Sequence, residues 1–171
     1  MNKLLSVCII TKNEEKNIGD CLASLKNIAN EIIVVDTGST DRTIEIAKQY
    51  GADVYYFEWI NDFSAARNES LKYATCDFIL CIDADERLGN PDVLLDYLTK
   101  IKNQKELDVQ IMTCKQINIF GKHINTTTSF SNVVRLFANN KGLHFEGKVH
   151  EQLYPRKDKI LYNTNVELIH Y

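Results

Sequence analysis

The chain has 171 residues, enough for one domain with a substantial buried core. Hydrophobic residues make up 44% and charged residues 25%, the composition of an ordinary globular protein. Twenty basic against twenty-three acidic residues give a net charge of −3, which argues against a protein that binds nucleic acid by neutralising its phosphates. We therefore expect no nucleic-acid partner.

The sequence also gives expectations about the membrane and the redox compartment. It has no apolar stretch of about 18 residues, so we expect no transmembrane segment, and its short apolar start does not resemble a signal peptide. The five cysteines are scattered and lack Cys-X-X-Cys spacing. Three of them lie in apolar patterns, which indicates reduced, buried thiols and a cytoplasmic protein. Peripheral contact with the inner face of a membrane stays open.

Residues 1–105 alternate between strand and helix patterns. Apolar, partly β-branched runs predict strands, and apolar residues at i, i+3, i+4 and i+7 predict helices. The predicted strands cover residues 4–10, 31–35, 52–57 and 78–82, and the helices between and after them cover residues 18–25, 44–50, 63–74 and 90–101. We expect Thr40 or Asp41 to cap the second helix, and Asn90 with Pro91 to start the fourth.

The pattern becomes β-rich after residue 105. Strands are predicted within residues 109–120, 133–137 and 160–169, and we interpret this half as an antiparallel extension that completes a cleft. No Pro/Gly/Ser-rich linker separates the halves. The predicted fold class is α/β, a single domain with a Rossmann-like, mostly parallel sheet, helices on both faces and a β-rich C-terminal extension.

Two carboxylates, Asp83 and Asp85, follow the apolar run of the fourth predicted strand. Ligands of open α/β sheets bind beyond the carboxyl ends of the strands. Mg²⁺ and Mn²⁺ favour carboxylate oxygens, and Mg²⁺ usually shares its coordination shell with substrate phosphates. This segment therefore predicts a metal that bridges to a diphosphate, and the alternative is a polar turn that ends a strand.

Asp36 lies at the same predicted edge, at the end of the second strand, and Thr11 and Glu14 follow the first strand. Asp36 is placed to accept a hydrogen bond from a base or a ribose, and the alternative is an Asx turn before a helix. The sequence contains neither Gly-X-Gly-X-X-Gly nor Gly-X4-Gly-Lys-Ser/Thr, which argues against a dinucleotide fold and excludes a P-loop.

Together these segments resemble the family 2 glycosyltransferases, inverting nucleotide-sugar enzymes with the GT-A fold. Four segments arrive in the family's order and spacing, at residues 8–15, 34–41, 63–68 and 82–85. A fifth, Phe-Glu-Gly-Lys-Val-His-Glu at residues 145–151, resembles the subgroup of peptide S-glycosyltransferases and lipopolysaccharide-core glucosyltransferases.

The resemblance implies a UDP-sugar as donor and assigns residues to it. Asp36 would bind the uracil, and Thr11 would line the same pocket, with Glu14 as a further candidate. Arg67 would reach the nucleotide, and its alternative is an ordinary exposed helical arginine. Asp83 would lie against the ribose or the metal.

The resemblance also implies which residues bind the metal and which residue acts as the general base. Asp85 would ligate Mn²⁺ or Mg²⁺ together with Asp83, and His170 would complete the metal or diphosphate contacts. An inverting transfer needs one general base to deprotonate the acceptor. Glu151 falls at the family's catalytic acidic residue, and His150 is its neighbour and competitor.

The function implied is an inverting, metal-dependent transfer to an acceptor glycan, lipid-linked sugar or peptide. Residues 1–105 would bind the nucleotide sugar, and residues 106–171 would form the acceptor half, which is expected to be truncated because the S-glycosyltransferase-like members continue into a helical-repeat region. Two alternatives stay open. A sugar-phosphate nucleotidyltransferase would carry a Gly-rich, basic loop after the first strand, and a nucleotide-sugar-binding domain would lack turnover.

Overall fold

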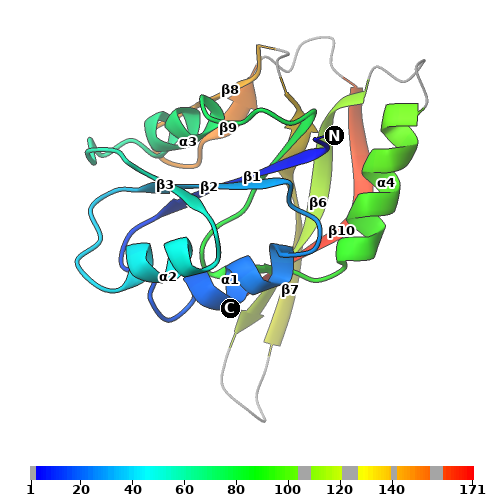
Figure 1. Cartoon of the computed structure of the whole chain (residues 1–171). Helices are drawn as coiled ribbons and strands as arrows, with labels where there is room; N and C mark the ends of the chain where they lie inside the picture. Colours follow the sequence, from blue (N-terminus) through cyan, green and yellow to red (C-terminus); the bar gives the residue numbers. More distant parts are fainter. Residues whose placement is uncertain (1–2, 104–108, 121–126, 140–141, 155–159) are drawn as a thin grey trace.

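The computed structural model describes residues 3–103, 109–120, 127–139, 142–154 and 160–171. The strands in this part of the chain are β1 (Leu5–Thr11), β2 (Glu31–Asp36), β3 (Asp53–Tyr56), β4 (Phe78–Cys81), β5 (Glu86–Leu88), β6 (Val109–Phe120), β7 (Thr127–Ala138), β8 (His144–Glu146), β9 (Gln152–Tyr154) and β10 (Ile160–His170). They form one large sheet in the order β3-β2-β1-β4-β7-β6-β10-β5, and β8 pairs with β9 (Figure 1).

The first half of the large sheet is parallel. β1 pairs with β2 on one side and with β4 on the other, and β3 continues the sheet beyond β2. β4 is buried along its whole length, as expected for a strand that is covered on both faces. The strands predicted from the apolar runs of this half are confirmed, and each end lies within one residue of its prediction.

Helices cover both faces, as predicted. α1 (Ile18–Leu25), α2 (Thr43–Gln49) and α4 (Pro91–Asn103) pack in the core of one face. α3 (Phe63–Leu71) packs in the core of the opposite face, next to β8 and β9 (Figure 1). The two faces of the sheet therefore have separate hydrophobic cores, and α3 shares its core with the β8–β9 hairpin.

The two predicted helix starts have different outcomes. α2 begins at Thr43 with Arg42 at its N-cap position, so the predicted cap is wrong, although Asp41 Oδ1 accepts from the backbone N–H of Thr43 at 3.0 Å. α4 begins at Pro91, as predicted. The side chain of Asn90, however, binds β10 instead of capping the helix, because its Oδ1 accepts from the backbone N–H of Glu167 at 2.9 Å. Asn90 thus fastens the start of α4 to the far part of the sheet.

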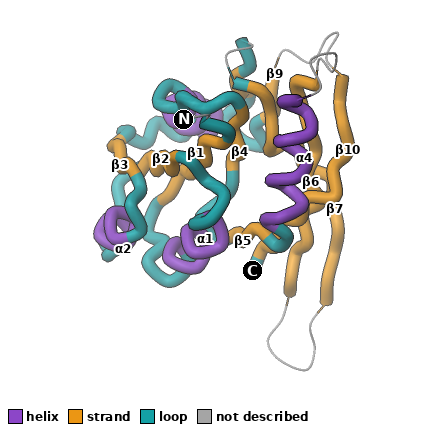
Figure 2. Tube along the Cα trace, turned by 45° about the vertical axis from the view of Figure 1, so that its right-hand side comes forward, coloured by secondary structure: helices purple, strands orange, loops and turns teal. Residues whose placement is uncertain are grey.

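The second half of the sheet is mixed. β7 is antiparallel to β4 and to β6, which confirms the antiparallel extension for these strands. β10 differs from that expectation because it runs parallel to β6. The chain crosses to the α3 face as β8 and β9 before it returns as β10, so it re-enters the sheet in the direction of β6. Figure 2 shows β6, β7 and β10 side by side, with α4 along them and the C-terminus near β5.

Other expectations can be compared with the described residues. All five cysteines are buried and free, as predicted. No helix in the described ranges is long and apolar enough to cross a membrane. The proposed boundary between the two halves, at residues 105 and 106, lies outside the described residues.

Candidate functional site

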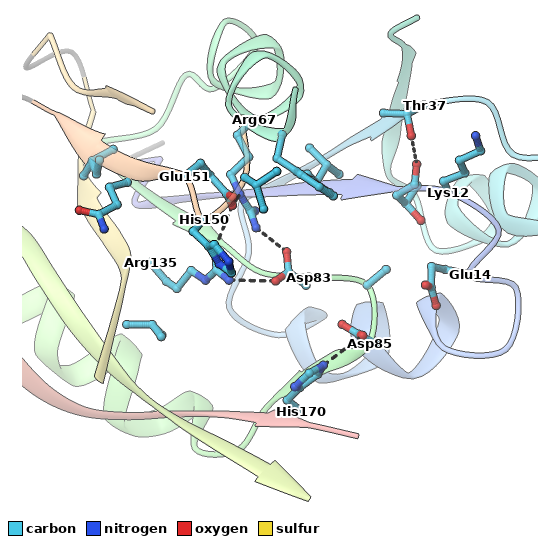
Figure 3. Close-up of a pocket in the computed structure, with 18 of the residues that line it drawn as sticks. Lys12, Glu14, Thr37, Arg67, Asp83, Asp85, Arg135, His150, Glu151 and His170 are labelled. Atoms are coloured by element: carbon cyan, nitrogen blue, oxygen red, sulfur yellow. Dashed lines mark hydrogen bonds and ion pairs between the residues drawn. The ribbon is translucent and has the colours of Figure 1, made fainter. Parts of the chain in front are cut away.

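A cavity of about 830 Å³ opens beyond the carboxyl ends of β1, β2 and β4. Thr11 ends β1, Thr37 follows β2 and Asp83 follows β4, so three parallel strands deliver residues to its wall. Arg135 of β7 and Glu151 of the β8–β9 loop also line it (Figure 3). This is the edge at which open α/β sheets bind ligands.

Asp36 and Thr11 are neighbours at one end of the cavity, because β1 and β2 pair them in register. Asp36 is buried, and its Oδ2 accepts from the backbone N–H groups of Gly38 (2.9 Å) and Ser39 (3.0 Å). Gly38 has a φ of 105°, which favours glycine. The Asx-turn alternative therefore accounts for one oxygen of Asp36.

The second oxygen of Asp36 is not used in the turn. Within the described part of the chain, Asp36 Oδ1 and Thr11 Oγ1 are buried and have no hydrogen-bond partner. An unpaired buried polar group costs about 1–3 kcal/mol. Thr11 lines the cavity, and Asp36, its partner across the strands, is not one of the lining residues. These two atoms can be satisfied by a ligand that enters this end of the cavity.

Glu14 and Lys12 line the cavity near the same end (Figure 3). Glu14 Oε2 accepts from the side-chain amide of Asn17 at 2.8 Å, just before α1. The contact is local to the start of this helix. The nucleotide role of Glu14 stays a prediction.

Four charged side chains from distant parts of the chain form an arginine–carboxylate cluster, consisting of Arg67, Asp83, Arg135 and Glu151. Arg67 donates from Nη2 to Asp83 Oδ1 at 2.7 Å and from Nε to Glu151 Oε1 at 2.5 Å. Arg135 donates from Nη2 to Asp83 Oδ2 at 2.9 Å, and its Nη1 is 3.8 Å from Glu151 Oε1. Both oxygens of Asp83 are therefore held by guanidinium groups.

The cluster is electrostatically balanced, with two cations and two carboxylates. Burial alone would raise the pKa of Asp83, but Arg67 and Arg135 outweigh it and lower the pKa to about 2. Burial would lower the pKa of Arg67, but the charges of Asp83 and Glu151 raise it. Arg67 is almost wholly buried, so the alternative of an ordinary exposed arginine is wrong.

Asp85 has a different partner from Asp83. Asp85 Oδ2 lies 3.1 Å from His170 Nε2, and His170 Nδ1 lies 2.9 Å from Asn118 Oδ1. The pairing of β10 with β5 brings His170 to this loop. A carboxylate is a suitable ligand for Mn²⁺, and a neutral imidazole is a common metal ligand. No group of three or more His, Cys, Asp or Glu side chains in the described residues is assembled to hold a metal.

A buried glutamate, Glu86, supports the loop between these carboxylates. Its Oε2 accepts from the backbone N–H of Asp83 at 2.8 Å, and its Oε1 accepts from Gln116 Nε2 at 2.6 Å. Burial raises the pKa of Glu86, and the charge of Asp83 adds to this effect. Glu86 and Gln116 thus fix the backbone that presents Asp83 to the cavity.

Glu151 and His150 end the loop between β8 and β9. His150 has a φ of 57°, and its exposed side chain lines the cavity. The hairpin is fastened to α3, because Asn68 donates to the Phe145 carbonyl (2.8 Å) and accepts from the Phe145 N–H (2.7 Å). The structure thus brings both predicted base candidates to the cavity, with Glu151 in the cluster and His150 outside its ion pairs.

Sequence reasoning missed Arg135 and Glu86. Arg135 lies inside a strand predicted from the apolar run at residues 133–137, and a charge inside such a run is the signal that could have revealed it. Glu86 follows the Asp-X-Asp segment directly, but its burial depends on Gln116, which is distant in sequence.

Comparison with known proteins places the chain in a family. The model of glycosyl transferase family 2 matches residues 6–158. The chain is 36% identical over 163 residues to the glycosyltransferase SunS of Bacillus subtilis (strain 168). This alignment covers 94% of this chain and 37% of SunS. The chain thus spans little more than a third of that relative.

Two solved structures have the same architecture. Residues 1–349 of TarS from S. aureus, in complex with UDP, match with a TM-score of 0.58 and 27% identity over 73% of this chain and 38% of that chain. Glucosyl-3-phosphoglycerate synthase from Mycobacterium tuberculosis, in complex with Mn²⁺, UDP and glucosyl-3-phosphoglycerate, matches with a TM-score of 0.52 and 27% identity over 67% and 44%. The chain has the GT-A fold and belongs to glycosyl transferase family 2.

Proposed function

We propose that the chain is the catalytic part of an inverting, metal-dependent glycosyltransferase that uses a UDP-sugar. The observation that carries the proposal is one cavity lined by Thr11, the Asp85–His170 pair and Glu151, with unpaired oxygens on Thr11 and on its strand neighbour Asp36. Thr11 and Asp36 suit a nucleobase, the Asp85–His170 pair suits a metal-bound diphosphate, and Glu151 suits an acceptor. Membership of the family supports the same reaction class.

The donor is assigned from the Asp36 end. Uracil carries an N–H that would donate a hydrogen bond to Asp36 Oδ1, and Thr11 lies beside Asp36. The TarS structure in complex with UDP and the synthase structure in complex with UDP and Mn²⁺ support this choice of nucleotide. Glu14 and Arg67, which also line the cavity, complete the proposed nucleotide contacts.

Asp85 and His170 would hold the divalent ion, Mn²⁺ or Mg²⁺. Such an ion would neutralise charge on the departing diphosphate. Asp83 was predicted to ligate the metal or contact the ribose, and with both oxygens bound to arginines it would ligate a metal only by giving up one of them. We therefore assign Asp83 first to the cluster and Asp85 to the ion.

Glu151 is the proposed general base. It would take the proton of the acceptor as the acceptor attacks the anomeric carbon from the face opposite the diphosphate, which inverts the configuration. Both of its ion pairs engage Oε1, which leaves Oε2 to receive the proton. His150, on the cavity wall, is the alternative base.

The acceptor is a glycan, a lipid-linked sugar or a peptide in this proposal. The synthase neighbour is described in complex with phosphoglyceric acid, an acceptor of another kind. Because the chain spans little more than a third of SunS, residues outside it would take part in acceptor choice.

UDP release from UDP-glucose, UDP-GlcNAc and UDP-galactose with Mn²⁺, in the absence of an acceptor, tests the proposal. Slow, Mn²⁺-dependent release from one of these donors is expected, because water replaces the acceptor. The ion pairs of Glu151 favour a second candidate, a nucleotide-sugar-binding domain without turnover. Tight UDP-sugar binding with no release would favour that candidate. The family match argues against a nucleotidyltransferase.

A further inference from the structure

We propose that Arg135 binds the diphosphate of the donor, as a second positive group besides the divalent ion. The inference rests on the proposed function, because it takes a nucleoside diphosphate sugar as the ligand. Arg135 lies outside the five segments that resemble the family.

Arg135 has hydrogen-bonding capacity that the protein does not use. A guanidinium carries five N–H donors. Arg135 Nη2 is bound to Asp83 at 2.9 Å, but Nη1 lies 3.8 Å from Glu151, too far for a hydrogen bond. Arg135 Nε is buried, and no atom of the described residues accepts from it. A buried donor without an acceptor indicates that a partner is supplied from outside the chain.

The cluster does not need Arg135 for its own positioning. Arg67 already binds both carboxylates, at 2.7 Å to Asp83 and 2.5 Å to Glu151, and only 4% of its side chain is exposed. The Arg135 side chain is 15% exposed and lines the cavity. Both arginines line the cavity, but Arg67 is held by two carboxylates, whereas Arg135 is the more exposed of the two and keeps donors for a ligand.

The position of Arg135 indicates which part of the nucleotide sugar it contacts. It lies between Asp83, on the donor side, and Glu151, the proposed base (Figure 3). Arg135 Nη2 is bound to Asp83, which follows β4 on the donor side of the cavity. A diphosphate that enters beside Asp83 therefore comes within reach of the Arg135 guanidinium. The planar fork of arginine matches phosphate oxygens and carries a permanent charge.

Calorimetric titration of UDP and of uridine in EDTA tests this assignment without the metal. Arg135→Gln is expected to weaken UDP binding by about 10- to 100-fold, as for the loss of a hydrogen bond to a charged group. Uridine binding is expected to stay unchanged, because uridine lacks the phosphates. Arg42→Gln is the matched control, because it removes the same charge from an exposed arginine that pairs with Glu45. This variant should leave the UDP and uridine affinities unchanged.

Arg135→Lys keeps the charge without the fork, so its UDP affinity should lie between those of the unmutated protein and Arg135→Gln. If circular dichroism shows that Arg135→Gln is unfolded, Arg135→Lys decides by the same UDP titration. UDP binding that is equal in the folded variant and the unmutated protein would overturn the assignment of Arg135 alone. Absence of UDP binding by the unmutated protein, with or without Mn²⁺, would overturn the proposed function as well.

Discussion

The two ends of the cavity differ in how far the protein satisfies its own polar groups. At the end formed by β1 and β2, Asp36 Oδ1 and Thr11 Oγ1 are buried without partners among the described residues. At the end formed by α3, β7 and the β8–β9 loop, two arginines hold two carboxylates in a closed cluster. The unpaired groups at the first end are a hydroxyl and a carboxylate oxygen, whereas at the second end the carboxylates are paired and the unpaired group is a donor, Arg135 Nε.

This difference indicates a division of labour. In the proposed function, the β1–β2 end would recognise a neutral group through hydrogen bonds, which would give selectivity because an unmatched ligand leaves them unpaired. The cluster end carries charges that respond to charge, so it suits a diphosphate and a proton transfer. The Asp85–His170 pair lies between them. Mutations at the two ends should therefore have different effects.

The largest effect is expected at the cluster end, from Glu151→Gln. The amide keeps the size of the side chain and can accept from Arg67, but it cannot act as a base. UDP release or sugar transfer should fall by roughly 10²–10⁴-fold, with donor affinity retained. Steady-state rates with the preferred UDP-sugar measure this. If Glu151→Gln is as active as the unmutated protein and His150→Gln is not, the base is His150.

Asp85→Ala addresses the region between the two ends. It removes one of the two proposed metal ligands, so the gain in UDP affinity on adding Mn²⁺ should disappear, a loss of about 10- to 100-fold. Uridine binding at the β1–β2 end should not change. Asp92→Ala, in the first turn of α4, provides a control for the loss of a carboxylate away from the cavity. A full Mn²⁺ effect in Asp85→Ala would contradict the assignment of the ion to this pair.

Asp36→Asn should change selectivity more than overall affinity. The amide can turn its NH₂ group toward a base acceptor, so the preference for UDP over CDP should fall by about tenfold, in keeping with 1–3 kcal/mol for a mismatched buried group. Competition binding of the two nucleotides measures the ratio. A ratio that Asp36→Asn leaves unchanged would show that the β1–β2 end does not select the base.

The smallest effect concerns acid stability at the cluster end. The pKa of Asp83 is about 2 in the folded chain, below its usual 3.8. Its ion pairs therefore stabilise the fold fully above about pH 4, and this contribution is lost as the pH falls toward 2. The stability difference between the unmutated protein and Asp83→Asn should shrink over that interval in urea unfolding. A difference that is constant from pH 6 to pH 2 would argue against these ion pairs.

The two halves of the fold were predictable to different degrees. β1 to β4 follow from local apolar runs, because β1, β2 and β4 are largely buried and the helix between each pair of strands has its own periodicity. β5, β8 and β9 have only three residues each. Segments this short carry too little pattern, and their pairing with distant strands or with each other creates them. The parallel pairing of β10 with β6 likewise depends on the route of the chain across the sheet.

The site divides in the same way. Thr11, Asp36, Asp83 and Asp85 were predictable because strand ends in a parallel sheet converge on one edge. The ion pairs of Asp83 were not, because Arg135 is brought in by β7 from 52 residues away. His170 and Glu151 were found only through the family resemblance, since no local pattern distinguishes a ligand or a base from an exposed polar residue.

The most direct test is calorimetric titration of the unmutated chain with UDP and with ADP, each in Mn²⁺ and again in EDTA. The account predicts that UDP binds more tightly than ADP in both conditions, because selectivity comes from the β1–β2 end. It also predicts that EDTA weakens UDP binding, because the diphosphate would be held by the ion that Asp85 and His170 bind. ADP binding as tightly as UDP, or a UDP affinity that EDTA leaves unchanged, would contradict it.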